Sequence, residues 1–278
     1  MKQVMNQDGM SPGVILPGTS VYKMRAEQSG REYVINIFVP DLAPPPGGYP
    51  VIYLLDANAV FGTMVEAMRI QSVRSDKTGV VPAVIVGIGY EARQPFPPER
   101  YYDFMMPVPE ADLPRRPDGA SWPEHGGAEA FMHFIEEQLK PEVEEKYPID
   151  RSRQSIVGHS LGGLFVLQML LGNPGTFRHY IAGSPSIHWN SAWITQQRAS
   201  WVSRAENCGT EMHVLIAAGE QEGSHPSGIL DRSKELAHWL SQTRLEGFSA
   251  EFTCYEDEGH ISVLPILMSR AIRFASRG

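Results

Sequence analysis

The sequence predicts a doubly wound α/β fold with a mostly parallel sheet, and three observations carry that prediction. Short runs of apolar and β-branched residues alternate with longer segments whose apolar residues recur at helical spacing. No tract of about 18 apolar residues, the length that spans a bilayer, interrupts this alternation. No internal repeat or inter-domain linker divides the 278 residues. We therefore expect one domain, 1–278, with antiparallel strands at one edge of the sheet.

The N-terminal half contributes the first strands and a crossover helix. Strands are expected at 32–40, 51–55 and 83–88, with a helix at 59–74 between the last two. Strand, helix and strand in this order predict a parallel crossover. Residues 90–127 contain many prolines and few periodic apolar residues, so we expect a lid or pocket wall that selects substrate. A helix at 128–146 follows, kinked at Pro141.

The C-terminal half repeats the alternation of strands and helices. The expected strands are 153–157, 180–182, 212–217 and 248–255, and the expected helices are 161–171, 193–204, 230–245 and 262–274.

Composition excludes several classes of function. The net charge of −8 argues against a nucleic-acid or anionic-membrane surface, because either needs a basic patch. Residues 1–10 lack the basic start and apolar stretch of a secretory signal, so a cytoplasmic location is expected. Cys208 and Cys254 are expected to be reduced thiols. No Cys/His cluster has zinc-ligand spacing, and neither a metal nor a cofactor is expected.

Residues 158–162 read Gly-His-Ser-Leu-Gly between a predicted strand and a predicted helix. Strand, tight turn and helix are the context of a nucleophile elbow, which exposes a serine hydroxyl at the top of a sheet. A turn this sharp needs residues without bulky Cβ groups, which Gly158 and Gly162 supply. Ser160 is therefore the candidate nucleophile. The alternative is a glycine-rich turn with a capping serine.

Candidate acid and base residues follow the last two strands of the predicted sheet. His260 comes after the final strand and can exchange a proton with Ser160 near neutral pH. Glu222 follows the preceding strand and is preferred over Glu220 as the residue that orients the histidine, because the loop has turned away from the strand there. Nucleophile, acid and histidine then occur in the chain order of an α/β-hydrolase. His225 is the main alternative base.

An oxyanion hole requires two preorganised N–H donors. One is expected from the backbone of Leu161, the residue after the nucleophile. The other is expected in the loop after the 51–55 strand, at Asn58, with Ala57 as the alternative.

Several segments together resemble a known family. They are 53–59, 158–165, 182–186, 219–222 and 259–265. They resemble the putative esterase family of α/β-hydrolases, and within it the siderophore esterases that cleave the trilactone of enterobactin, bacillibactin or salmochelin. The resemblance covers residues 15–275 and implies an α/β-hydrolase fold and hydrolysis of a carboxylic ester by a serine.

Two departures from the family pattern concern the substrate. Ala57 stands where a Leu-Asp-Gly-Asn turn usually has glycine, and Ile-His-Trp at 187–189 stands where Leu-Trp-Trp is usual. These changes leave ester hydrolysis intact but alter the expected pocket wall. Trp189 is expected to contact substrate there.

A ferric catecholate is a polyanion, so a protein of net negative charge needs a local cluster of cations to attract it. Arg100 opens a segment, 100–104, that resembles the Arg-x-x-Asp-Tyr segment before the lid in siderophore esterases, and it is expected to bind substrate. The candidate cluster comprises Arg93, Arg100, Arg115 and Arg116. The alternative is a solvated loop in which these arginines have no function.

The predicted partner is a small-molecule ester, with an iron-siderophore as the leading candidate. Two other functions remain open at this point. The chain can be a general carboxylesterase or acyl-transferring enzyme for small esters, or a hydrolase-fold binding protein without catalysis.

Overall fold

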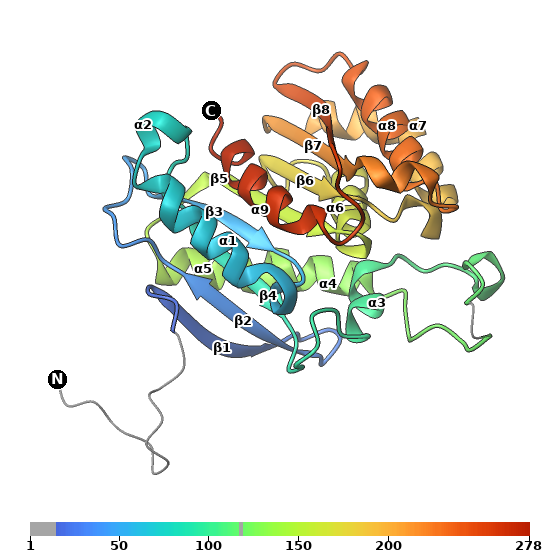
Figure 1. Ribbon diagram of the computed structural model, residues 1–278, viewed down its shortest axis with the longest axis horizontal. Coiled ribbons are helices and arrows are strands. Elements are labelled where there is room, and N and C mark those ends of the chain that lie inside the picture. The colour runs from blue at the N-terminus through green and yellow to red at the C-terminus, as the bar shows by residue number, and fades with distance from the viewer. Residues whose placement is uncertain (1–14, 117–118) are drawn as a thin grey trace, which may run out of the picture.

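The computed structural model describes residues 15–116 and 119–278, which contain an eight-stranded sheet with the order β1-β2-β4-β3-β5-β6-β7-β8 (Figure 1). β1 pairs with β2 and β2 with β4 in antiparallel fashion, and all remaining pairs are parallel. The expected doubly wound sheet with antiparallel edge strands is confirmed. The strands are β1 (Thr19–Arg25), β2 (Glu32–Phe38), β3 (Tyr49–Leu54), β4 (Val84–Gly89), β5 (Ile149–His159), β6 (His179–Gly183), β7 (Met212–Gly219) and β8 (Phe248–Tyr255).

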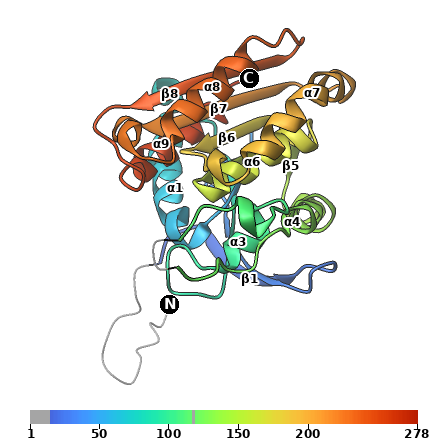
Figure 2. The same ribbon diagram turned by 90° about the vertical axis from the view of Figure 1, so that its right-hand side faces the viewer.

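Helices cover both faces of this sheet. α1 (Ala57–Ser72) and α9 (Val263–Phe274) pack side by side on one face, and α4 (Ala128–Phe134), α6 (Leu161–Gly172) and α7 (Ser191–Asn207) lie on the other (Figure 2). The remaining α-helices are α2 (Ser75–Thr78), α3 (Glu99–Phe104), α5 (Lys140–Lys146) and α8 (Ile229–Ser241). Shorter turns of helix are η1 (Glu110–Asp112), η2 (Ile135–Leu139), η3 (Ile187–Trp189) and η4 (Glu220–Ser224).

The central strands and α6 form the rigid centre of the molecule. All residues of β3, β4 and β6 are buried, as expected for parallel strands covered on both faces. Helix α6 is apolar on every side and buried from Leu161 to Leu171. The segment that begins at residue 160 is therefore held by packing on all sides.

The structure differs from the predicted elements at several places, and β5 begins at Ile149 rather than at 153. Strand β1 was not predicted, because its sequence is polar and its Val21 is 65% exposed, and pairing with β2 is what orders it. Helix α8 ends at Ser241 rather than at 245. The 128–146 helix is continuous but contains η2, a π-helical turn, directly before α5, in which Pro141 is the second residue.

The 90–127 segment projects from the body of the molecule and contains α3 and η1 rather than an unbroken loop (Figure 1). Residues 117–118 within it, and residues 1–10, on which the expected location depends, lie outside the described residues. No helix within 15–116 or 119–278 is long and apolar enough to cross a membrane.

Candidate active site

The elbow predicted at Ser160 is present between β5 and α6. Ser160 has φ 59° and ψ −117°, a conformation that an L-residue rarely adopts and that raises its side chain above the turn. A Cβ on Gly158 would lie 2.2 Å from the carbonyl oxygen of Gly162, so this close approach requires glycine. The sequence dictates the turn, and the packing of α6 holds it.

Ser160, His260 and Glu222 form a continuous hydrogen-bonded chain. The Ser160 Oγ lies 3.0 Å from His260 Nε2, and His260 Nδ1 lies 2.5 Å from Glu222 Oε1. The histidine follows β8, the glutamate follows β7, and the serine follows β5. Because these strands are parallel, their carboxyl ends meet at one edge of the sheet. Residues 100 positions apart are brought into contact in this way.

Glu222 lies in an environment that favours its ionised form. Its side chain is 3% exposed, and its Oε2 accepts hydrogen bonds from Ser184 Oγ at 2.7 Å and from the backbone N–H of Gly219 at 2.8 Å. Burial acts to raise the pKa of this carboxyl, but the hydrogen bonds from His260, Ser184 and Gly219 outweigh it and leave the pKa below its ordinary value.

The alternative acid and base have other hydrogen-bond partners, although His225 lines the same cavity as Ser160. Glu220 is exposed, and its carboxylate accepts the backbone N–H of Asp257 at 3.2 Å, so it ties together two loops. His225 is exposed and its Nδ1 lies 2.6 Å from Ser227 Oγ. The structure brings Glu222 and His260, rather than these two residues, to Ser160.

Leu161 and Asn58 both lie in the first turn of a helix. Leu161 is the first residue of α6 and Asn58 the second of α1, so their backbone N–H groups belong to first turns, which have no acceptor inside their own helix. The Asn58 amide side chain is engaged elsewhere: it donates to the carbonyls of Tyr90 and Ala92 and accepts the Tyr90 N–H, all within 2.9 Å. Its backbone N–H is therefore the group that can serve as a donor, and Ala57, the first residue of α1, remains the neighbouring alternative.

The structure places Arg100, expected to bind an anionic substrate, inside the protein rather than in an exposed cluster of arginines. Arg100 is 5% exposed, and its guanidinium forms a two-pronged ion pair with Asp56, at 2.7 and 2.8 Å. Burial would lower the pKa of the guanidinium, but the attraction of the Asp56 carboxylate raises it. Its charge is already paired with Asp56 inside the protein, and a role in binding an anionic substrate stays a prediction.

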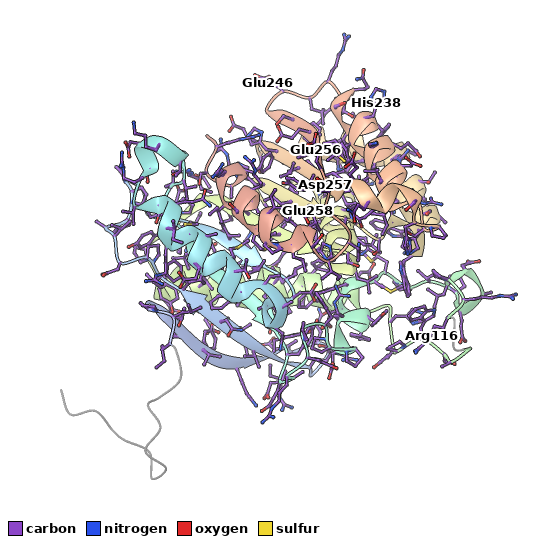
Figure 3. All side chains as sticks on the ribbon, viewed as in Figure 1. Arg116, His238, Glu246, Glu256, Asp257 and Glu258 are labelled. Carbon is purple, nitrogen blue, oxygen red and sulfur yellow. The ribbon has the colours of Figure 1, made fainter. Side chains whose placement is uncertain are left out.

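The other three arginines of the expected cluster belong to different surroundings. Arg93 and Arg115 are exposed, whereas Arg116 lies partly buried over the ring of Trp122, 5.1 Å from its centre. Arg116 is found in the projecting segment, away from the β8–α9 loop that carries Glu258 (Figure 3).

His159, the residue before the nucleophile, is buried against the candidate base. The centres of the His159 and His260 rings are 4.7 Å apart, and neither ring nitrogen of His159 has a hydrogen-bond partner. Burial lowers the pKa of His159 to about 3, and the neighbouring His260 and Arg100 act in the same direction. A neutral imidazole therefore packs beneath His260 at physiological pH.

A cavity of about 290 Å³ opens beside Ser160 and His260, and Trp189 forms part of its wall. An aromatic cluster continues from Trp189 into the projecting segment. Trp122 meets Trp189 edge-on with ring centres 4.4 Å apart, and Tyr101 stacks on Trp122 at 5.6 Å. The Trp122 indole N–H donates to the Pro114 carbonyl at 2.6 Å, which fixes the ring. The projecting segment is thus attached to the pocket wall by aromatic contacts.

Two serines of the site lie in the 182–186 segment, which resembles the esterase family but received no functional role from the sequence. Ser184 holds Glu222, and Ser186 Oγ lies 3.2 Å from Ser160 Oγ. Both follow β6, the strand between β5 and β7. Their position after a central parallel strand was a usable signal, since polar residues there face the same edge as the nucleophile.

Metal ligands do not gather at this site. Across residues 15–116 and 119–278, no group of three or more His, Cys, Asp and Glu side chains is placed to hold a metal ion.

Comparison with known proteins decides the family. The model of the family described as "Putative esterase" matches residues 26–260. The chain belongs to this family. It is a carboxylic ester hydrolase with the α/β-hydrolase fold, as the sequence predicted.

Individual relatives agree with this assignment. The ferri-bacillibactin esterase BesA of Bacillus subtilis (strain 168) is 55% identical over 96% of this chain and 92% of its own length. A siderophore enterobactin esterase of Emericella nidulans is 41% identical, with 81% of each chain covered. The crystal structure of the BES protein from Bacillus cereus superposes with a TM-score of 0.90 at 40% identity, covering 97% of this chain and 100% of that one.

Proposed function

We propose that this esterase hydrolyses the ester bonds in the backbone of a ferric siderophore through an acyl-enzyme at Ser160. The observation that carries the catalytic part is the chain of hydrogen bonds from Ser160 through His260 to the buried Glu222. The substrate part is supported by relatives that are described as ferri-bacillibactin and enterobactin esterases.

Acylation begins with proton transfer from Ser160 to His260. The Ser160 Oγ attacks the ester carbonyl carbon while Nε2, at 3.0 Å, accepts its proton. Glu222 keeps the proton of the imidazole on Nδ1, which leaves Nε2 as the acceptor, and stabilises the imidazolium that forms. The lowered pKa of Glu222 keeps this carboxylate charged throughout.

The tetrahedral intermediate carries a negative charge on the former carbonyl oxygen. The backbone N–H groups of Leu161 and Asn58 are the proposed donors to this oxygen, and Ala57 is the alternative to Asn58. The intermediate collapses when the C–O bond to the leaving alcohol breaks and His260 returns the proton to that oxygen. A water molecule then attacks the acyl-enzyme with His260 as base, which releases the acid and restores Ser160.

The size of the cavity restricts how a trilactone can bind. At about 290 Å³ it lies at the small end of ligand pockets, which range from about 300 to 1,000 Å³. It has room for one ester and its adjoining arm, so the rest of a siderophore must lie outside it. Trp189 lines the cavity, and Tyr101 and Trp122 continue from it as an aromatic surface that can receive an aromatic arm. The residues that line the cavity all lie outside 90–127, so in this proposal the segment extends the wall outward from Trp189 and selects substrate there.

A cytoplasmic location is part of the proposal, since an enzyme that opens a ferric siderophore acts after its uptake. The thiols of Cys208 and Cys254 are both free, which is the usual state in a reducing compartment.

The decisive experiment compares kcat/KM for four substrates: a ferric catecholate trilactone, the same compound without iron, a small aryl ester and a feruloyl ester. We expect the ferric trilactone to be the best substrate, and intact-mass analysis after fluorophosphonate treatment to find the label on Ser160. A preference for the aryl ester would indicate that the substrate is a general ester rather than a siderophore. A label on another residue would remove Ser160 from its role.

A further inference from the structure

The buried ion pair between Arg100 and Asp56 lies immediately beneath the candidate oxyanion hole. Both partners are almost entirely buried, at 5% and 1% exposure, and two nearly parallel hydrogen bonds join them. Buried ion pairs are expensive, because both charges lose their hydration. Neither charge touches the hydrogen-bonded chain of Ser160, His260 and Glu222 directly, so the triad alone does not explain the pair.

This ion pair connects three segments, namely the β3–α1 turn, α3 and the end of β5. Asp56 is the residue before α1 and has φ 53° and ψ 42°, a left-handed conformation that an aspartate adopts at some cost. Arg100 belongs to α3, at the base of the projecting segment. The Arg100 guanidinium also donates to the carbonyl of His159, at 3.4 Å, just before the nucleophile.

The same pair is in contact with the first turn of α6. A Cβ on Gly162 would lie 3.2 Å from Asp56 Oδ2, so the Asp56 carboxylate fills the space between the beginnings of α1 and α6. The candidate donors, Asn58 and Leu161, are in these two first turns. Their separation and direction therefore depend on where the carboxylate is held.

We infer that Arg100 and Asp56 are positioning residues that set the oxyanion hole, by fixing the β3–α1 turn against the Ser160 elbow. The pair acts before any substrate arrives. Without the arginine, the left-handed turn at Asp56 relaxes and carries the Asn58 N–H away from the oxyanion. Electrostatic stabilisation of this kind depends on donors that need no reorganisation during the reaction, so a small displacement lowers kcat. This inference depends on the proposed role of Ser160.

The test compares Arg100→Met and Arg100→Lys on a small neutral aryl ester. Arg100→Met is expected to lower kcat by about 10²–10³-fold, the loss typical of a missing oxyanion donor, and to leave KM within about threefold. Arg100→Lys keeps the charge but not the planar fork, and about a tenfold loss is expected. The inhibition constant of an arylboronic acid, whose tetrahedral adduct uses the same donors, should rise by the factor by which kcat falls.

Tyr33→Phe is the matched control. It removes a buried hydrogen bond, 2.9 Å from the Tyr33 hydroxyl to Asp103, which lies on α3 as Arg100 does. Asp103 reaches the β3–α1 turn through Tyr90, whose own hydrogen bonds to Asp103 and Asn58 this substitution leaves in place. It should lower the melting temperature without changing kcat or the boronic acid inhibition constant. Equal changes in kcat for Tyr33→Phe and Arg100→Lys would overturn the inference.

Further outcomes also test the positioning role of Arg100 and Asp56. A wild-type kcat and boronic acid inhibition constant for Arg100→Lys would overturn the inference even if Arg100→Met does not fold. A rise in KM confined to an anionic ester would give the arginine a role in substrate binding instead. If Ser160→Ala retains activity, the proposed function itself fails, and that result is distinct from an inactive Ser160→Ala accompanied by a fully active Arg100→Lys.

Discussion

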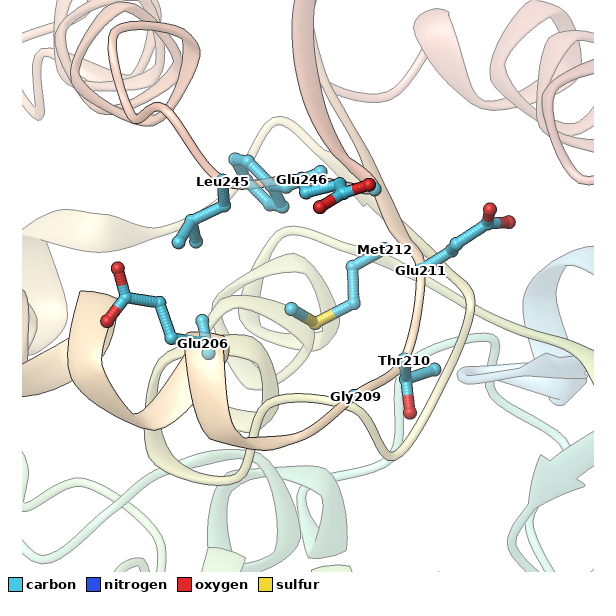
Figure 4. A pocket seen from close by; sticks show the side chains of 10 residues that line it. Glu206, Gly209, Thr210, Glu211, Met212, Leu245 and Glu246 are labelled. Atoms are coloured by element: carbon cyan, nitrogen blue, oxygen red, sulfur yellow. The ribbon is translucent and has the colours of Figure 1, made fainter.

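Strand β7 has a hollow at each of its ends, and both hollows contain glutamate. At its carboxyl end lies the cavity of about 290 Å³ that contains Glu222. At its amino end lies a larger one, about 440 Å³, bordered by Glu206, Glu211 and Glu246 (Figure 4). Volume and acidic residues alone would favour the amino end as the binding site.

The surroundings of the carboxylates separate the two hollows. Glu222 is 3% exposed and accepts three hydrogen bonds, one of them from His260. Glu211 is 58% exposed and pairs with Arg178, while the carboxylates of Glu206 and Glu246 point apart (Figure 4). Convergence of buried partners, rather than the size of the hollow, identifies a site where charge can be controlled.

The largest predicted effect tests whether catalysis takes place at the carboxyl end of β7. Ser160→Ala and His260→Ala are each expected to reduce kcat by on the order of 10⁶-fold, because triad residues act as a unit. Both proteins should remain folded by circular dichroism. Substantial turnover by either variant would contradict the proposed mechanism.

Glu222→Gln is the next test, because it keeps the shape of the side chain but favours the wrong tautomer of His260. We expect kcat to fall by about 10⁴-fold. Glu220→Gln is the matched control two residues away and should lose little activity. A greater loss at Glu220 would reverse the assignment of the acid.

Asp103 is a third carboxylate to compare with Glu222, because it is also buried but its hydrogen-bond donors are two tyrosines rather than a histidine. Burial raises its pKa from 3.8 to about 6, although the Tyr33 and Tyr90 hydroxyls both donate to it. A folded-state pKa above the unfolded one means that stability is present below pH 3.8 and is lost as the pH rises through 6.

Asp103→Asn should therefore remove this loss. Between pH 4 and pH 6.5, the free energy of unfolding of the wild type should fall relative to the variant by up to about 3 kcal/mol. Urea unfolding at several pH values measures the difference. A constant difference across this range would show that Asp103 titrates normally.

Ser184→Ala removes one of the two hydrogen bonds to Glu222 Oε2 and leaves the Gly219 N–H in place. Because a hydrogen bond to a charged group contributes about 1.5–3 kcal/mol, a loss of about tenfold in kcat is expected, with little change in KM. Unchanged steady-state kinetics would reduce Ser184 to a structural residue.

The smallest effects are expected at the amino end of β7. Glu206→Gln and Glu246→Gln should leave kcat and KM unchanged and alter the free energy of unfolding by less than about 0.5 kcal/mol. Loss of activity in either variant would show that the larger hollow has a function and would contradict the assignment of the site to the carboxyl end of β7.

Local sequence was sufficient for the elements and for much of the candidate site. The alternation of apolar runs predicted most strands and helices, since buried strands and helices differ in periodicity. The elbow at 158–162 and the position of His260 after the last strand were also readable from the sequence. Strand β1 was missed because its residues are polar and only its pairing with β2 orders it.

The sequence by itself determined the fold class, the strained turn at Ser160 and the order of nucleophile, acid and histidine. The first two follow from patterns among neighbouring residues, and the third follows from the position of each residue just after a predicted strand. Only the tertiary structure decided that Glu222 rather than Glu220 meets His260, that Ser184 supports it, and that Arg100 is buried against Asp56, 44 residues away. An arginine in a proline-rich loop has the same local sequence whether it faces solvent or the interior. Its surroundings are set by the long-range packing of α3 against α4 and α6, which local sequence patterns do not record.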